Sequence, residues 1–277
     1  MIGAVLRAAA LLLMFGSVGA YAGETLRLAV TTSFHNSGLS DVLLPAVQAE
    51  TGLTVDLLVV GTGQALRLGQ AGDVDAVFVH SPAAEKAFVA AGYAPHRTEI
   101  MDNDFVILGP RSSIADVAAA ESAHQAFSAI AAAGAPFVSR GDDSGTHRRE
   151  RAIWSATQHV PDGADDPWYR EVGGSMGATL NIAAAMGAYT LSDRASWLNF
   201  ANKADLTIVF EGGPALFNQY AYLPISQDRH PHVNADLAAV LEAFLISPEG
   251  QQLIGAYQID GETPFTPNPN LAAPLDG

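Results

Sequence analysis

Short hydrophobic runs rich in β-branched residues alternate with helical repeats of apolar residues along most of the chain. A strand is predicted over residues 25–31, and the helical repeat that follows it stops at Gly52, which is typical of a helix C-terminus. Further strands are predicted near Tyr189 and over residues 54–60, 74–79, 105–108, 137–139, 206–210 and 220–225. Helices are predicted over residues 64–71, 82–91, 122–132, 146–157, 177–186 and 234–245. Strands that alternate with helices predict a parallel α/β fold.

The pattern divides into two units at Gly109-Pro110, a strong breaker that follows the strand over residues 105–108. A chain of 277 residues is long enough for two modest lobes. We expect residues 23–110 and 218–277 to form lobe I and residues 111–217 to form lobe II, because the last elements return to the first unit. Parallel sheets bind ligands at the carboxyl ends of their strands, so we expect the functional site in a cleft between the lobes.

Residues 1–22 have the pattern of a signal peptide. Arg7 is their only charged side chain, residues 8–18 form an apolar run, and Ala20-Tyr21-Ala22 has the small residues that precede a cleavage site. An apolar run of about 11 residues is much shorter than the roughly 20 of a membrane-spanning helix, which argues against an uncleaved anchor. We therefore expect cleavage near Ala22 and a periplasmic protein.

Composition removes several classes of function. Fourteen Lys and Arg against 29 Asp and Glu give a net charge of -15, and so acidic a surface repels nucleic acid and anionic lipid. The chain has no cysteine, which excludes disulfides, thiolate metal ligands and a cysteine nucleophile. Hydrophobic residues make up 49% and charged residues 16%, as in a globular protein.

Four segments share one design, in which a predicted strand is followed by small or hydroxyl residues and then by the start of a helix. They cover residues 31–33, 61–65, 139–147 and 174–180. Ser and Thr are ordinary N-cap residues, so each segment alone fits plain capping. Unpaired amides at a helix N-terminus also bind anions, and four such segments in both lobes indicate convergence on one oxyanion. The candidate donors are Thr32, Ser33, Thr62, Arg140, Ser144, Gly145, Thr146, Gly177 and Ala178.

Arg140 is the most specific of these candidates. It directly follows the strand over residues 137–139, and its planar guanidinium donates two hydrogen bonds to one oxyanion more readily than a lysine does. The alternative is a structural ion pair of Arg140 with Asp142 or Asp143. Arg140 could form this ion pair and also bind the ligand if the carboxylate only orients the guanidinium.

Several of these motifs together resemble the tungstate-binding component of the Tup-type ABC importer, over nearly all of the chain after residue 22. The motifs are Thr31-Thr32-Ser33, Val60 to Leu66, Asn103 to Val106, Pro136 to His147, Met176 to Leu180, Tyr189 to Arg194 and His230 to Asn234. The resemblance implies a type II periplasmic binding-protein fold, a tungstate cleft between two lobes, and delivery to a membrane permease driven by an ATPase. The chain departs from the family at Val30, Phe34 and His35, which makes the donors of the first motif the least secure.

Other functions fit the sequence less well. A binder of molybdate, phosphate or sulfate is the alternative of the same class. Gly173 to Gly177 matches a nucleophile elbow around Ser175, with Asp205 and His230 in hydrolase order, but residues 165–169 before it resemble a turn rather than a strand. His230 and His232 have the spacing of a metal pair, yet they precede a helix start at Asn234. We expect a monomeric binding protein that is not an enzyme and has neither metal nor cofactor.

Overall fold

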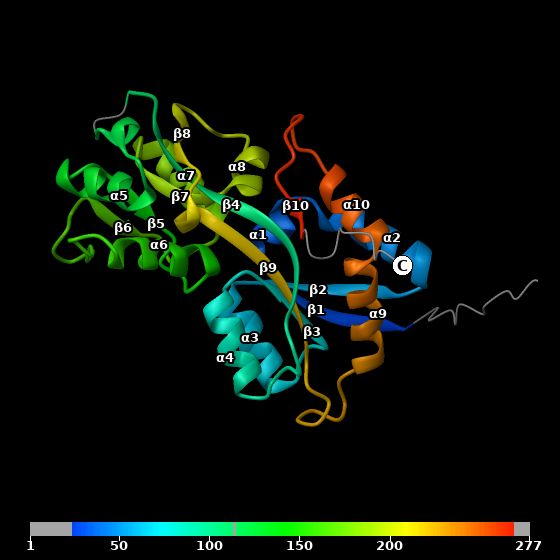
Figure 1. The fold of residues 1–277 in the computed structure, drawn as a ribbon. Helices are drawn as coiled ribbons and strands as arrows, with labels where there is room; N and C mark the ends of the chain where they lie inside the picture. Colours follow the sequence, from blue (N-terminus) through cyan, green and yellow to red (C-terminus); the bar gives the residue numbers. More distant parts are fainter. Residues whose placement is uncertain (1–23, 113–114, 269–277) are drawn as a thin grey trace, which may run out of the picture.

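The alternating strands and helices from β1 to β3 form a parallel sheet with helices on both faces (Figure 1). The computed structural model describes residues 24–112 and 115–268, so the predicted signal peptide lies outside the described residues. In lobe I, β1 pairs in parallel with both β2 and β3. The elements of this lobe are β1 (Thr25–Thr31), α1 (Thr32–Asn36), α2 (Ser40–Thr51), β2 (Thr54–Val60), α3 (Thr62–Ala71), β3 (Ala76–Val79), α4 (Pro82–Ala90), α9 (Ala235–Ile246), α10 (Pro248–Ala256) and β10 (Thr266–Pro267).

Lobe II is built around a smaller parallel pair, β5 and β6, and lies beside lobe I in Figure 1, in green and yellow. Its helices and strands are α5 (Ala123–Ala132), β5 (Phe137–Ser139), α6 (Gly145–Ser155), β6 (Tyr169–Glu171), α7 (Met176–Met186), β7 (Thr190–Asp193), α8 (Arg194–Asn199) and β8 (Leu206–Glu211), with 3-10 turns at Val117–Ala119 and Pro214–Leu216. No helix in the described part of the chain is long and apolar enough to span a membrane.

Two long antiparallel strands, β4 (Thr98–Pro110) and β9 (Phe217–Pro224), run from one lobe to the other (Figure 1). In lobe I, β9 also pairs with β3, which gives the strand order β10-β4-β9-β3-β1-β2. In lobe II, the second half of β4 pairs with β7 and β8. The two strands pair with each other and form one antiparallel ribbon that connects the lobes.

Each lobe has its own hydrophobic core. Ile100 and Met101 of β4 belong to the core of lobe I, whereas Phe105 and Ile107 pack with lobe II. The predicted lobe limits stay a proposal. This packing supports a crossing point before Phe105 on β4, and Leu216, in the lobe II core, supports the limit at residue 217.

Helix α8 joins the two cores. Ala195 and Leu198 pack with the core of lobe I, whereas Trp197 packs with lobe II. The side chain of Asn199 donates hydrogen bonds to the carbonyls of Asn36 (3.0 Å) and Ser37 (2.7 Å), at the end of α1. The lobes thus have a third connection besides β4 and β9.

Candidate functional site

Three hydroxyl groups between the lobes are buried without a hydrogen-bond partner among the described residues. They belong to Ser33, Thr62 and Thr146, which are 1%, 0% and 1% exposed. All three lie in the first turns of helices, two of them in lobe I (α1 and α3) and one in lobe II (α6). A buried hydroxyl without a partner costs roughly 1–3 kcal/mol, so these groups are suited to an external hydrogen-bond acceptor.

Contacts across the cleft bring the starts of these helices together. The Arg140 Nη2 lies 3.5 Å from the Thr32 Oγ1, so lobe II meets α1. A Cβ added to Gly61, the residue before α3, would lie 3.9 Å from the Ser144 Cα, at the start of α6. The carboxyl ends of β1 and β2 therefore meet α6 at one place, as the sequence predicted for the cleft.

Arg140 is buried at 2% exposure and is held from several sides. Its Nη2 donates to the Asp142 Oδ2 at 2.5 Å, and its Nε donates to the Gly174 carbonyl at 3.3 Å. Asp142 therefore forms the ion pair that the sequence offered as the alternative for Arg140, in a geometry that also orients the guanidinium toward Thr32. Asp143 instead pairs with Arg148, at 2.8 and 3.0 Å.

The start of α6 combines capping with free donors. The Ser144 Oγ accepts from the His147 amide at 3.1 Å, and the Ser144 amide donates to the Asp142 Oδ1 at 3.2 Å. The amides of Gly145 and Thr146 are in the first turn, where no intrahelical acceptor exists. Ser144 thus caps the helix, while its hydroxyl hydrogen can still point to a ligand.

The start of α7 lies next to the same arginine through the Gly174 carbonyl. The Ser175 Oγ accepts from the Ala178 amide at 3.3 Å, so Ala178 is engaged in the cap. Gly177 precedes it in the first turn, and a Cβ there would meet no atom within 4 Å. Of the two donors predicted in α7, Gly177 therefore has the amide that is free for a ligand.

Two polar groups beside Arg140 were missed by the sequence reasoning. Asp193, which ends β7, is fully buried; its Oδ1 accepts from the Ser196 amide at 2.9 Å, and its Oδ2 has no partner among the described residues. Burial raises the pKa of Asp193, and the charge of Arg140 opposes that shift. His80 directly follows β3 and is 4% exposed. Both residues lie at strand ends, which is the signal that could have found them.

The three departures from the family pattern do not face the cleft. Val30 and Phe34 belong to the hydrophobic core of lobe I, where Phe34 meets the Phe78 ring edge-on at 4.9 Å. His35 is exposed on α1. These substitutions therefore change packing and surface rather than the donors of the first motif.

The hydrolase alternative finds no support in the geometry. The hydroxyl of Ser175 caps α7, Asp205 pairs with Arg111 at 3.9 Å, and His230 packs against Gly72 at the end of α3. Residues 165–168 lie in turns as expected, and the strand that precedes Ser175, β6, has only the three residues Tyr169–Glu171. No cluster of three or more metal-ligating side chains occurs in residues 24–112 and 115–268.

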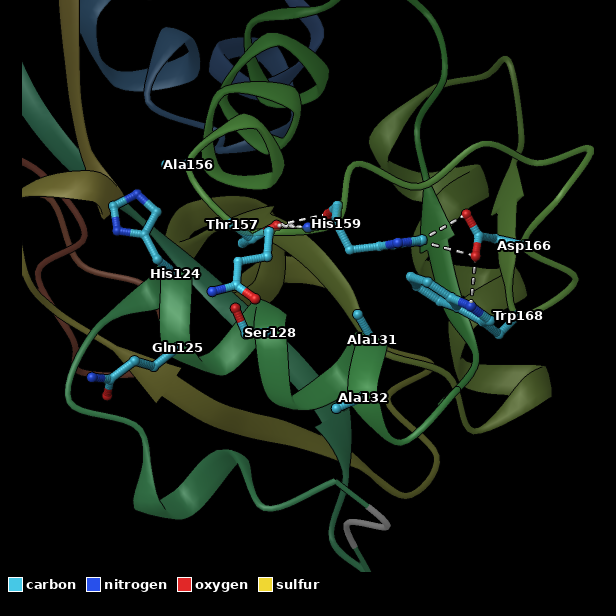
Figure 2. Close-up of a pocket in the computed structure, with 11 residues that line it drawn as sticks. His124, Gln125, Ser128, Ala131, Ala132, Ala156, Thr157, His159, Asp166 and Trp168 are labelled. Carbon is cyan, nitrogen blue, oxygen red and sulfur yellow. Dashed lines mark hydrogen bonds and ion pairs between the residues drawn. The ribbon is translucent and has the colours of Figure 1, made fainter.

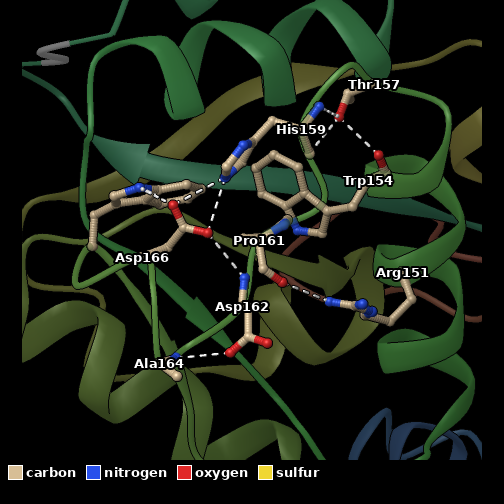
Figure 3. Close-up of polar contacts among 9 residues, drawn as sticks. Arg151, Trp154, Thr157, His159, Pro161, Asp162, Ala164 and Asp166 are labelled. Atoms are coloured by element: carbon tan, nitrogen blue, oxygen red, sulfur yellow. Dashed lines mark hydrogen bonds and ion pairs between the residues drawn. The ribbon is translucent and has the colours of Figure 1, made fainter.

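A separate groove of about 690 Å³ lies on lobe II, between α5 and residues 156–168 (Figure 2). Asp166 organises one wall, because it accepts hydrogen bonds from the Asp162 amide, the Trp168 indole and His159 (Figure 3). The groove shares no residue with the cleft. None of its lining side chains has a buried polar atom without a partner among the described residues, in contrast to Ser33, Thr62 and Thr146 of the cleft.

Comparisons with known proteins agree with this geometry. The family model described as the PBP superfamily domain matches residues 19–249. The tungstate-binding protein TupA of Peptoclostridium acidaminophilum is 40% identical over 245 residues, which cover 87% of this chain and 85% of that protein. The TupA of Campylobacter jejuni is 34% identical, over 82% of this chain and 85% of its own.

Solved structures give the same result. TupA from Desulfovibrio alaskensis G20 is 42% identical with a TM-score of 0.77, over 88% of this chain and 98% of that one. The tungstate ABC transporter structure from Geobacter sulfurreducens is 44% identical with a TM-score of 0.78, over 85% and 100%. The predicted two-lobed fold and family resemblance are confirmed. The chain belongs to the periplasmic binding protein superfamily, in the family of the TupA proteins.

Proposed function

We propose that this protein captures tungstate in the cleft between its lobes and delivers it to an ABC importer. The observation that carries the proposal is the set of buried hydroxyls of Ser33, Thr62 and Thr146, which have no hydrogen-bond partner among the described residues and lie at the helix starts that meet between the lobes. Tungstate is a tetrahedral dianion that is fully deprotonated at neutral pH, so its oxygens only accept. A cradle of hydroxyls, helix amides and one guanidinium offers donors to each of them.

The proposed ligands are Thr32, Ser33, Thr62, Arg140, Ser144, Gly145, Thr146 and Gly177, with Ala178 as the weakest member of the set. The net charge of -15 does not oppose anion binding, because surface charges are screened beyond about 8 Å at physiological salt. In this proposal the signal peptide is cleaved near Ala22 and the protein is a periplasmic monomer. It binds its ligand without catalysis and without a cofactor. Its partners are the permease and ATPase of the importer.

A melting-temperature panel tests the ligand. A ligand at 1,000 times its dissociation constant stabilises the folded state by about 4.1 kcal/mol, so tungstate should raise the melting temperature clearly. Molybdate, which has the same charge and geometry, should act similarly, whereas phosphate and sulfate serve as the comparison. A shift with phosphate or sulfate and none with tungstate would assign the cleft to the other oxyanion.

A further inference from the structure

The imidazole of His80 connects three parts of the molecule that meet at the cleft. His80 follows β3 of lobe I, and its Nδ1 lies 2.9 Å from the Asn218 Oδ1, on the crossing strand β9. Its ring packs on Tyr220, with 4.7 Å between the ring centroids, and lies 6.1 Å from the Phe105 ring. A ring that is buried, hydrogen-bonded and stacked in this way has little freedom to rotate.

The free face of this ring covers Gly145, the first residue of α6 in lobe II. A Cβ added to Gly145 would lie 2.5 Å from Cε1, 2.8 Å from Nδ1 and 3.0 Å from Nε2 of His80, and real Cβ atoms do not approach other atoms below 3.0 Å. Gly145 is not among the residues with positive φ, so its backbone does not require glycine. The contact with His80 is what excludes a side chain there.

The ring is also compatible with the charges of the cleft. Burial, with the charges of Arg140 and Arg149, lowers the pKa of His80 to about 4. The imidazole is therefore neutral at neutral pH and does not repel the guanidinium that faces the ligand.

We propose that His80 is a positioning residue for anion binding, whose ring sets the start of α6 against lobe I and strand β9 when the lobes close. It acts through Gly145 and not as a ligand. By contacting Gly145, the ring holds the amides of Gly145 and Thr146 at the place where the two lobes meet, so that both can donate to the anion. This inference rests on the proposed function, because the amides that it positions are those assigned to the anion.

A double-mutant cycle tests the inference by calorimetric titration with sodium tungstate. Gly145→Ala should weaken tungstate binding by about tenfold or more when His80 is present, and by less than about threefold in the His80→Ala background, because contacting residues couple. Gly163→Ala is the matched control, since a Cβ there would meet only the Tyr169 carbonyl, at 3.7 Å, and it should not change affinity. An equal cost of Gly145→Ala in both backgrounds contradicts the inference.

A second measurement separates this inference from the proposed ligand. With a saturating amount of whichever oxyanion raises the melting temperature of the wild type, Gly145→Ala should leave the radius of gyration in small-angle scattering larger than that of the wild type, and adding His80→Ala should reverse the increase. If the wild type binds no tungstate while this coupling is present, the proposed function fails and the role of His80 in lobe contact stands. Loss of folding by Gly145→Ala only when His80 is present supports the contact, whereas loss of folding in both backgrounds contradicts it.

Discussion

Arg140 shows how a single side chain can decide binding. Its Nε and Nη2 donate to different partners, the Gly174 carbonyl and Asp142, and Thr32 of the opposite lobe lies against the same Nη2. Arg140→Lys keeps the charge but loses the planar fork. We expect tungstate affinity to fall by more than about tenfold, or about 1.4 kcal/mol, in calorimetric titration.

Arg148→Lys is the control for this prediction. Arg148 forms a similar ion pair with Asp143, but one that is partly exposed, and exposed pairs contribute little. The tungstate affinity of the Arg148→Lys variant should stay within about threefold of that of the wild type, a difference of roughly 0.7 kcal/mol. If Arg140→Lys also stays within that limit, Arg140 is not the forked donor of the site.

Glu150 gives a prediction about pH. Glu150 lies in the middle of α6 and is 1% exposed. Its carboxylate accepts hydrogen bonds from the Tyr169 hydroxyl (2.7 Å) and the Trp154 indole (3.2 Å). Burial raises its pKa from 4.5 to about 7. Between these two pH values the folded state keeps a proton on Glu150 that the unfolded state has lost. The contribution of Glu150 to the free energy of unfolding therefore falls as the pH rises from 4.5 to about 7.

Glu150→Gln cannot ionise, so this loss should disappear. The measurement is the free energy of unfolding of both proteins, from denaturant unfolding at about pH 5 and about pH 8. The value of the variant minus that of the wild type should be larger at about pH 8 than at about pH 5. Glu85, whose pKa burial also raises to about 7, is present in both proteins and cancels in the comparison. The exposed Glu121→Gln is the control. A stability difference that does not depend on pH would contradict the assignment.

At the scale of elements, the sequence predicted those whose ends carry strong local signals. Ser122, the first residue of a predicted helix, caps α5, Asn234 caps α9 as expected, and Gly52 ends α2 with φ 77°. The predicted strand over residues 25–31 coincides with β1. These elements depend on neighbours in the sequence, which is why a single sequence is sufficient to find them.

Some of the missed elements depend on distant partners, whereas α10 was missed although Ser247 caps it and Pro248 begins it. The first half of β4, Thr98 to Asp104, is mostly polar and is a strand because it pairs with β9, more than 100 residues later in the chain. Helix α8 has six residues and is stabilised by packing between the two cores. Asp193 caps it, so the buried carboxylate beside Arg140 could not be placed without that helix. The donors of the candidate site, by contrast, lie in strand-to-helix turns that the sequence marks directly.

The contact of α8 with α1 gives a prediction for lobe closure. Asn199→Ala removes two hydrogen bonds to the end of α1, and a typical hydrogen bond contributes roughly 0.5–1.5 kcal/mol. We expect a lower free energy of unfolding and weaker tungstate binding, because the closed arrangement loses an interlobe contact. Asn202→Ala is the control, since the Asn202 side chain donates a hydrogen bond of 3.0 Å to Asn181 on the surface of lobe II. Equal effects of both variants would show that α8 does not connect the lobes energetically.

At the scale of the whole molecule, the proposed ligands come from both lobes, so neither lobe alone surrounds the anion. Thr32, Ser33 and Thr62 belong to lobe I, whereas Arg140 and Thr146 belong to lobe II. Closure about β4 and β9 should therefore accompany binding, as in hinge-type proteins. Small-angle scattering should show a smaller radius of gyration with saturating tungstate. An unchanged radius while calorimetry shows binding would mean a preformed cleft or a site within one lobe.

Selectivity among oxyanions tests the central claim most directly. Phosphate carries a proton at neutral pH and needs an acceptor, but Asp142 is engaged by Arg140, and Asp143 by Arg148. The third carboxylate near Arg140, Asp193, has a pKa raised by burial, which disfavours the charged form that would accept this proton most strongly. A carboxylate aimed at a deprotonated dianion would cost electrostatic energy without forming a hydrogen bond. The measurement is a calorimetric titration with tungstate, repeated in the presence of phosphate. The account predicts one tungstate per chain and no displacement by phosphate at comparable concentration; displacement by phosphate, or no binding of tungstate, would contradict it.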